Sequence, residues 1–148
     1  MAGEGKDPLV SFTYALDLGG KVKGYFTECS GLGSEHDVVE HKVVDEKGRQ
    51  MIKMVPGRIK WDKITLKRGI TDAKDIWDWR KKVEDGQVED ARIDGSIIMM
   101  DQELKPVARW NFEGGWPSKV SGPQLKSASN EIGVEELTIV HHRLERVQ

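Results

Sequence analysis

The chain has 148 residues and a formal net charge of -2 at pH 7, and charged residues make up 32% of it. This length fits one domain, and the balanced charge argues against a strongly basic nucleic-acid-coating chain and against an acidic disordered tail. No apolar run approaches the roughly 18 residues of a membrane-spanning helix. The start, MAGEGKDPLV, lacks the pattern of a secretory signal peptide, and a lone cysteine suits folding in a reducing cytoplasm.

Alternating apolar and polar residues predict that most of the chain is β. Residues 1–8 are small and polar, and we expect them to form a mobile N-terminal arm. From Val10 to Leu18 the alternation has a period of two, and Gly19-Gly20 predicts a hairpin turn after this strand. The same reasoning predicts further strands over residues 22–28, 35–44, 49–55, 58–66, 92–101, 107–113 and 134–144.

The segment from Glu35 to Val55 predicts a β-hairpin around a turn at Asp45–Gly48. Both faces of this hairpin mix apolar and charged residues, so neither face matches a simple core. We therefore expect the hairpin (35–55) to project and to contact another chain in part. Pro56-Gly57 is expected to end it.

One helix is predicted, over about residues 72–85. Thr71 is a suitable N-cap, and Asp72 and Asp75 favour the positive end of the helix dipole. Apolar residues recur at helical spacing, which predicts a packing stripe made of Ala73, Ile76, Trp79 and Val83 with Trp77 on its flank.

The predicted strands 92–101 and 107–113 supply further core residues. Ile97 and Met99 belong to a run that is apolar on both faces, and Trp110 and Phe112 share one face of the next strand. Together the elements predict a mainly β fold, an antiparallel barrel or sandwich with one flanking helix. The residues GGWP at 114–117 are expected to end the strand predicted over 107–113.

Motifs for catalysis, metals or cofactors are missing from the sequence. It contains no phosphate-binding loop and no H-E-x-x-H. His36 and His41 are five residues apart in a predicted strand, which places them on opposite faces. They therefore cannot both bind the same metal ion. Cys29 has no predicted base beside it, and Glu135-Glu136 is expected to lie on a solvated edge. We therefore predict no enzymatic activity, no metal and no cofactor.

The order of several motifs resembles a known family. The run GYFTECSGL (24–32) precedes ITLKRG (64–69), a helix carrying IWDW (76–79), and Trp116-Pro117. In this order the motifs resemble the tail tube proteins of contractile phages and phage-tail-like injection systems, over about Phe12 to Leu144.

This resemblance implies a structural role. The whole chain would be a single tube-subunit domain (1–148), and copies of it would form hexameric rings that stack into a tube with a central channel. The implied partners are the chain itself, a sheath protein, baseplate or hub and tube-terminator proteins, and cargo protein or DNA in the channel, without sequence-specific nucleic-acid binding. Such a protein is made in the cytoplasm and assembled into a phage tail or an extracellular or cytoplasmic injection particle.

The resemblance also implies roles for particular residues. The hairpin would line the channel and reach the next ring, with Glu35, Asp37, Glu40, Lys42, Arg49 and Lys53 as its polar residues. The strands around Ile97, Met99, Trp110 and Phe112 would complete each subunit's share of an inner sheet.

Two other functions stay open at this point. One is a paralogue from the same machines that initiates the tube or belongs to the baseplate hub, and forms one ring without propagating. The other is a small β-barrel ligand-binding domain with a cleft at Trp61 and Trp116.

Overall fold

The computed structural model describes residues 11–71, 73–123 and 133–148. Within these residues the chain forms ten strands and two helices. In chain order the elements are β1 (Thr13–Leu18), β2 (Lys21–Phe26), β3 (Glu28–Ser30), β4 (Ser34–Val44), β5 (Gln50–Trp61), β6 (Ile64–Gly69), α1 (Asp75–Glu84), α2 (Val88–Ala91), β7 (Ile93–Met100), β8 (Pro106–Ser121), β9 (Val134–Val140) and β10 (Arg143–Arg146).

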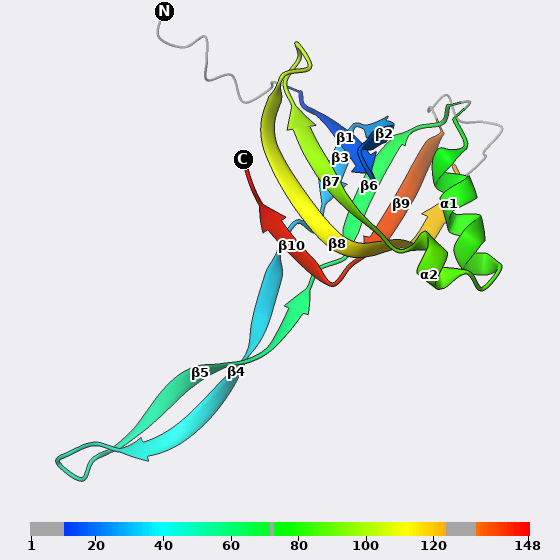
Figure 1. The fold of residues 1–148 in the computed structure, drawn as a ribbon. Helices are drawn as coiled ribbons and strands as arrows, with labels where there is room; N and C mark the ends of the chain where they lie inside the picture. The colour runs from blue at the N-terminus through cyan, green and yellow to red at the C-terminus, as the bar shows by residue number, and fades with distance from the viewer. Residues whose placement is uncertain (1–10, 72, 124–132) are drawn as a thin grey trace, which may run out of the picture.

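Antiparallel pairing links eight strands into one curled sheet, which confirms the mainly β prediction. The strand order is β2-β1-β7-β8-β9-β6-β3, and β10 pairs with β8. Thr27 joins β2 to β3 and donates its N–H to the carbonyl oxygen of Lys67 on β6, at 2.8 Å. This bond brings the end of β2, the first strand in this order, next to β6 near the other end of the order, so the sheet closes into a barrel (Figure 1).

The core fills the inside of this barrel with side chains from seven elements. Alternate residues along each strand point inward, as a half-buried strand requires. The fully buried side chains include Leu16, Phe26, Ile64, Leu66, Ile76, Ile97, Phe112, Leu137 and Ile139.

Helix α1 packs on one side of the barrel through Ile76 and Trp79 (Figure 1). The indole N–H of Trp79 donates to the carbonyl oxygen of Ala91 at 2.7 Å, which ties α1 to α2.

The start of the helix differs from the prediction. The N-cap position is Lys74, without a side-chain hydrogen bond, so the assignment of Thr71 was wrong. The Thr71 hydroxyl instead accepts the N–H of Ala73 at 3.2 Å, in the turn before the helix, and Ala73 is exposed rather than part of the packing stripe. Asp72 lies outside the described residues. Helix α2 was not predicted, because four residues are too few to show helical periodicity.

Strand β8 does not end at residues 114–117, contrary to the prediction. It continues to Ser121 and spans 16 residues in all, pairing first with β7 and β10 and then with β9. Gly114 adopts a φ of 62°, and Gly115 packs against the ring of Phe112, where no Cβ would fit. The two glycines therefore bend the strand instead of ending it.

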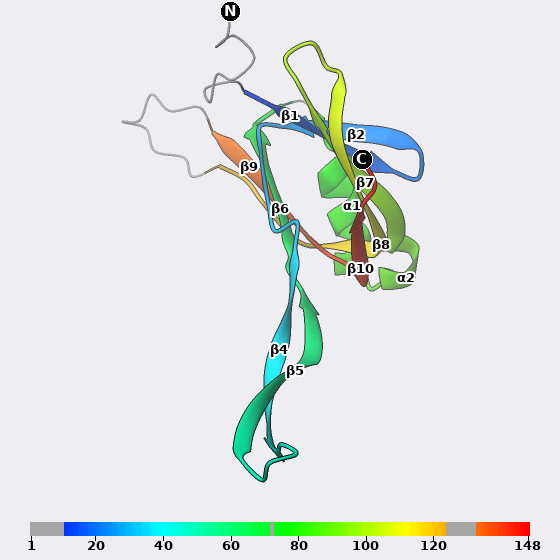
Figure 2. The same cartoon turned by 90° about the vertical axis from the view of Figure 1, so that its left-hand side faces the viewer.

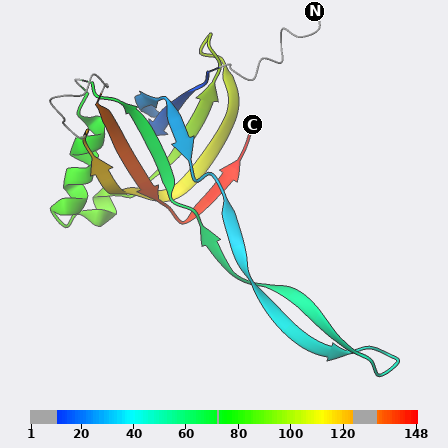
Figure 3. The same ribbon diagram turned by 180° about the vertical axis from the view of Figure 1, so that it is seen from behind.

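Strands β4 and β5 form a separate two-stranded sheet that projects from the barrel (Figures 1, 2 and 3). The prediction that Pro56-Gly57 ends the hairpin was wrong. These two residues lie inside β5, where the register with β4 shifts. A Cβ on Gly57 would lie 2.9 Å from the Cγ2 of Val39, so only glycine allows the two strands this close approach.

Two predicted strands are each divided in the structure. The strand predicted over 58–66 breaks at Asp62-Lys63, where the chain leaves the hairpin and enters the barrel. The strand predicted over 134–144 breaks at His141-His142, between β9 and β10. Both breaks lie at the root of the hairpin.

Two glycines with similar φ allow a matched test of backbone packing. Gly31 has a φ of 83°, and a Cβ there would collide with the backbone carbonyl of Lys63; Gly48 has a φ of 78° and open space around it. We expect Gly48→Ala to cost about 1–2 kcal/mol of unfolding free energy through φ strain alone, and Gly31→Ala to cost clearly more. Urea unfolding measures both, and equal losses would contradict the packing constraint at Gly31.

Candidate functional site

The projecting hairpin is the candidate functional site, and its tip is ordered by one carboxylate. Asp45 accepts the N–H groups of Lys47 at 2.9 Å and Arg49 at 2.8 Å, and its other oxygen lies 3.2 Å from the Nε of Arg49. Gly48 supplies the positive φ that the turn needs. These hydrogen bonds hold the tip in one shape, and the Arg49 side chain is bound to Asp45 within the tip.

The register of the hairpin divides its side chains into two faces. Residues that are opposite each other in the ladder point to the same side. On what we name the open face, each exposed apolar residue of the distal half stands opposite a polar one: Val44 and Gln50, Lys42 and Ile52, Glu40 and Met54. On what we name the paired face, apolar residues stand opposite each other: Val43 and Met51, Val39 and Val55.

This division separates the predicted polar residues of the hairpin. Glu40 and Lys42 lie on the open face, whereas Glu35, Asp37 and Lys53 lie on the paired face. The three acidic residues therefore do not form one patch.

Asp37 is neutralised by a neighbour within the hairpin. Its carboxylate lies 3.0 Å from the Nζ of Lys60, across the strands. This hydrogen bond and the charge of Asp37 raise the pKa of Lys60. Both side chains are exposed, so the pair fixes local charge more than stability.

An unpaired buried histidine marks the root of the hairpin. The His141 ring packs against Trp61 of β5 at 5.8 Å and against Phe112 of β8 at 6.3 Å between ring centroids. Both ring nitrogens are buried without a hydrogen-bond partner of ordinary geometry among the described residues. Burial lowers the pKa of His141, despite the nearby backbone of Asp62 and Arg143, and His142 adds to the lowering.

A buried ion pair lies on the other side of the barrel, where we had expected a solvated edge. Arg68 and Glu135 are almost fully buried, with 3.1 Å between Nε and Oε2. The indole N–H of Trp77 donates to the other oxygen of Glu135 at 3.0 Å. The prediction of a solvated edge was wrong for Glu135. Its position could have indicated burial, because Glu135 alternates along β9 with the core residues Leu137 and Ile139 and so shares their face.

The residues assigned to helix packing and to the inner sheet differ in burial. Ile76, Trp79, Ile97 and Phe112 are buried, and Val83, Met99 and Trp110 are half-buried. Trp77 remains partly exposed, and the Arg146 guanidinium lies 5.6 Å from the Trp110 ring.

The opposite side of the same strands carries a polar cluster that sequence reasoning missed. Ser96 of β7 donates to the Asn111 side chain at 2.7 Å, and Arg109 donates to Ser96 at 3.1 Å. Since Ser96 and Asn111 are cross-strand partners, the cluster follows from a register that the sequence alone does not give.

The described residues offer little for catalysis. In the ranges given above, no group of three His, Cys, Asp or Glu side chains could hold a metal ion. Burial raises the pKa of Cys29 to about 12, so its thiol stays protonated at neutral pH. Among the described residues there is no helix long and apolar enough to cross a membrane.

Comparison with known proteins gives a consistent result. The family model described as T4-like virus tail tube protein gp19 matches residues 10–145. A chain in the PVC sheath–tube complex of an extracellular contractile injection system, in its extended state, is 25% identical, with a TM-score of 0.74 over 97% of this chain and 93% of that chain. The tube-terminating cap of the anti-feeding prophage is 26% identical, with a TM-score of 0.72 over 99% of each chain.

More distant likeness extends to the fold alone. Hcp1 from Flavobacterium johnsoniae is 15% identical, with a TM-score of 0.52 over 90% of this chain and 93% of that chain. No curated protein sequence matches the chain.

The buried ion pair predicts a large effect at one of two adjacent acids. Glu135→Ala would leave Arg68 charged, buried and unpaired, so we expect a loss of about 3–5 kcal/mol of unfolding free energy. Glu136→Ala, the matched control on a half-buried neighbour, is expected to cost less than about 1 kcal/mol. Urea unfolding at neutral pH measures both, and a small loss for Glu135→Ala would show that Arg68 finds another partner.

The lowered pKa of His141 predicts a loss of stability in acid. Below its ordinary pKa of 6.5 the unfolded chain binds a proton that the folded chain refuses, so stability falls as the pH drops from 6.5 toward the lower folded pKa. Thermal melting between about pH 7.5 and about pH 5.5 should show this slope, and His141→Phe should reduce it. His41→Asn, on the exposed hairpin, should keep the wild-type slope; an unchanged slope in His141→Phe would assign the effect to other groups.

Proposed function

Because the chain belongs to the T4-like virus tail tube protein gp19 family, we propose that its copies close into hexameric rings that stack into a hollow tube. The protein is a structural subunit of a tail tube. The observation that carries the proposal is the family match, which runs over residues 10–145 and so includes both the barrel and the hairpin. Closed rings satisfy exposed strand edges, and head-to-tail stacking propagates them into a filament.

The hairpin is the element that we assign to contacts between subunits and to the channel. A two-stranded hairpin is at best marginally stable alone in water, and this one leaves apolar side chains exposed. A neighbouring subunit would cover them. Its polar residues would then lie at the channel or at the subunit boundary: Glu35, Asp37, Glu40, Lys42, Arg49 and Lys53.

The partners that we propose follow from the machines to which the relatives belong. Those relatives come from a sheath–tube complex and a tube-terminating cap, so a sheath, a baseplate or hub, and a terminator are the expected neighbours of this tube. Cargo protein or DNA would pass through the channel without sequence-specific contacts. The subunit would be made in the cytoplasm and assembled into a phage tail or an injection particle.

A second function within the same machine is a paralogue at one end of the tube, as an initiator, hub or terminator. The similarity to the tube-terminating cap, which is 26% identical over 99% of each chain, favours this alternative. Such a subunit would form a single ring and stop.

Negative-stain electron microscopy of the purified protein over a concentration series tests the proposal. We expect rings or tubes with a central hole and sixfold symmetry, growing longer as concentration rises. Single rings that never stack would favour the end-of-tube paralogue. Subunits that stay monomeric and also fail to extend a supplied baseplate would contradict the tube function.

A further inference from the structure

The two faces of the hairpin are not equivalent, and the difference lies in what their own side chains already cover. On the paired face, Val39 contacts the strand opposite at Val55, and Val43 stands opposite Met51. These rungs give each apolar side chain an apolar neighbour within the hairpin. Val43 and Val55 are half-buried, and their partners Met51 and Val39 are 50% and 41% exposed, less than the apolar residues of the open face.

On the open face the cross-strand neighbours of Val44, Ile52 and Met54 are polar, and Val38 stands opposite Pro56; these four apolar side chains remain in water. Val38 is 67% exposed, Met54 60% and Ile52 56%. Exposed apolar residues that follow one another along one face mark a contact surface more than a solvated one. The open face of the hairpin contains the apolar residues Val38, Val44, Ile52 and Met54; Pro56 stands opposite Val38, and the polar residues Gln50, Lys42 and Glu40 stand opposite the other three.

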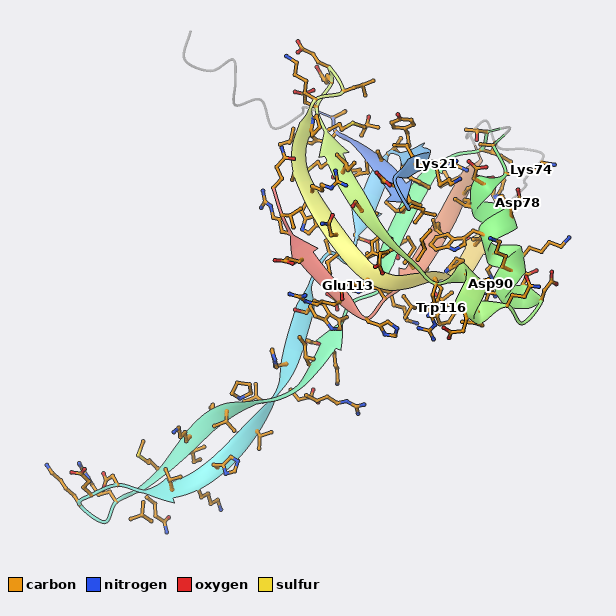
Figure 4. The ribbon with its side chains drawn as sticks, in the orientation of Figure 1. Lys21, Lys74, Asp78, Asp90, Glu113 and Trp116 are labelled. Atoms are coloured by element: carbon orange, nitrogen blue, oxygen red, sulfur yellow. The ribbon has the colours of Figure 1, made fainter. Side chains whose placement is uncertain are left out.

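We infer that the open face of the hairpin is the surface that a second copy of this chain covers, while the paired face stays turned to water. This inference rests on the proposed tube function, which makes the second copy the available occupant. The hairpin projects clear of its own barrel, so within residues 11–71, 73–123 and 133–148 no other part of the same subunit reaches the open face (Figures 1, 3 and 4).

The charges on the two faces agree with this assignment. The open face carries Glu40 and Lys42, one of each sign, which leaves no net charge to repel an identical chain. The paired face carries the exposed ion pair of Asp37 with Lys60 at 3.0 Å, together with Glu35 and Lys53. Charges that are solvated and paired in this way cost free energy when another protein buries them.

Two adjacent residues give a matched test. Ile52 on the open face and Met51 on the paired face are 56% and 50% exposed. Ile52→Glu would stand opposite Lys42, which favours the hairpin itself, so a loss of assembly could not be ascribed to a weakened hairpin. We expect Ile52→Glu to raise the concentration needed for assembly about tenfold or more, and Met51→Glu to change it less than about threefold. Sedimentation and electron microscopy of the full chain measure both, and circular dichroism verifies folding.

Cysteine labelling gives a second measurement that does not depend on disrupting the assembly. In assembled tubes Ile52→Cys should react with iodoacetamide much more slowly than Met51→Cys, and in the unassembled chain the two should react alike. Cys29 contributes little background, because burial raises its pKa to about 12. Equal protection, equal assembly defects, or greater effects at Met51 would overturn the assignment of faces. Wild-type protein that never assembles, even on a supplied baseplate, would instead overturn the tube function and this inference with it.

Discussion

The fold depends on one strand, β8, that joins the two halves of the barrel. β8 pairs with β7 and β10 over its first part and with β9 over its second, so a bend inside it decides whether the barrel closes. Gly115 lies at this bend against the rings and methyl groups of Phe112 and Ile139, where a side chain would collide. Without the bend, strands β1 and β7 would not face strands β6 and β9 across the barrel, and the shared core would be lost.

The closed barrel then positions both the helix and the hairpin. Glu135 on β9 holds Arg68 on β6 and the indole of Trp77 on α1, so one buried carboxylate links the two strands to the helix. A buried ion pair of this kind adds little net stability over an apolar pair, but it tolerates few alternative arrangements. At the root of the hairpin, on the other side of the barrel, Trp61 at the end of β5 packs on His141, which follows β9. This ring contact ties the root of the hairpin to the barrel.

The sequence predicted what depends on local pattern and missed what depends on register. The alternation in β1 and the glycine turn after it are local, and the structure has both. The apolar stripe of α1 is local too, and the structure has it at Ile76, Trp79 and Val83 but not at Ala73. Pro56-Gly57 and the glycines of residues 114–117 predict ends of strands, because such residues usually interrupt pairing. In the folded chain each pair instead sits at a bulge or a bend, which only the partner strand determines. Glu135 was misplaced for a similar reason, since its partner Arg68 is distant in sequence.

The mixed pattern of the hairpin has a physical reading once the register is known. Apolar and polar residues facing each other across the ladder keep the open face from being a continuous apolar patch, which would drive unordered association of free subunits. The same arrangement leaves enough exposed apolar surface for contact when many copies are held in register. A hairpin with one fully apolar face would associate too readily, and one with two polar faces would not associate. On the proposed tube function, the intermediate pattern would let copies associate once they are held in register. The same pattern conceals the difference between the two faces when the sequence is read only for alternation with a period of two.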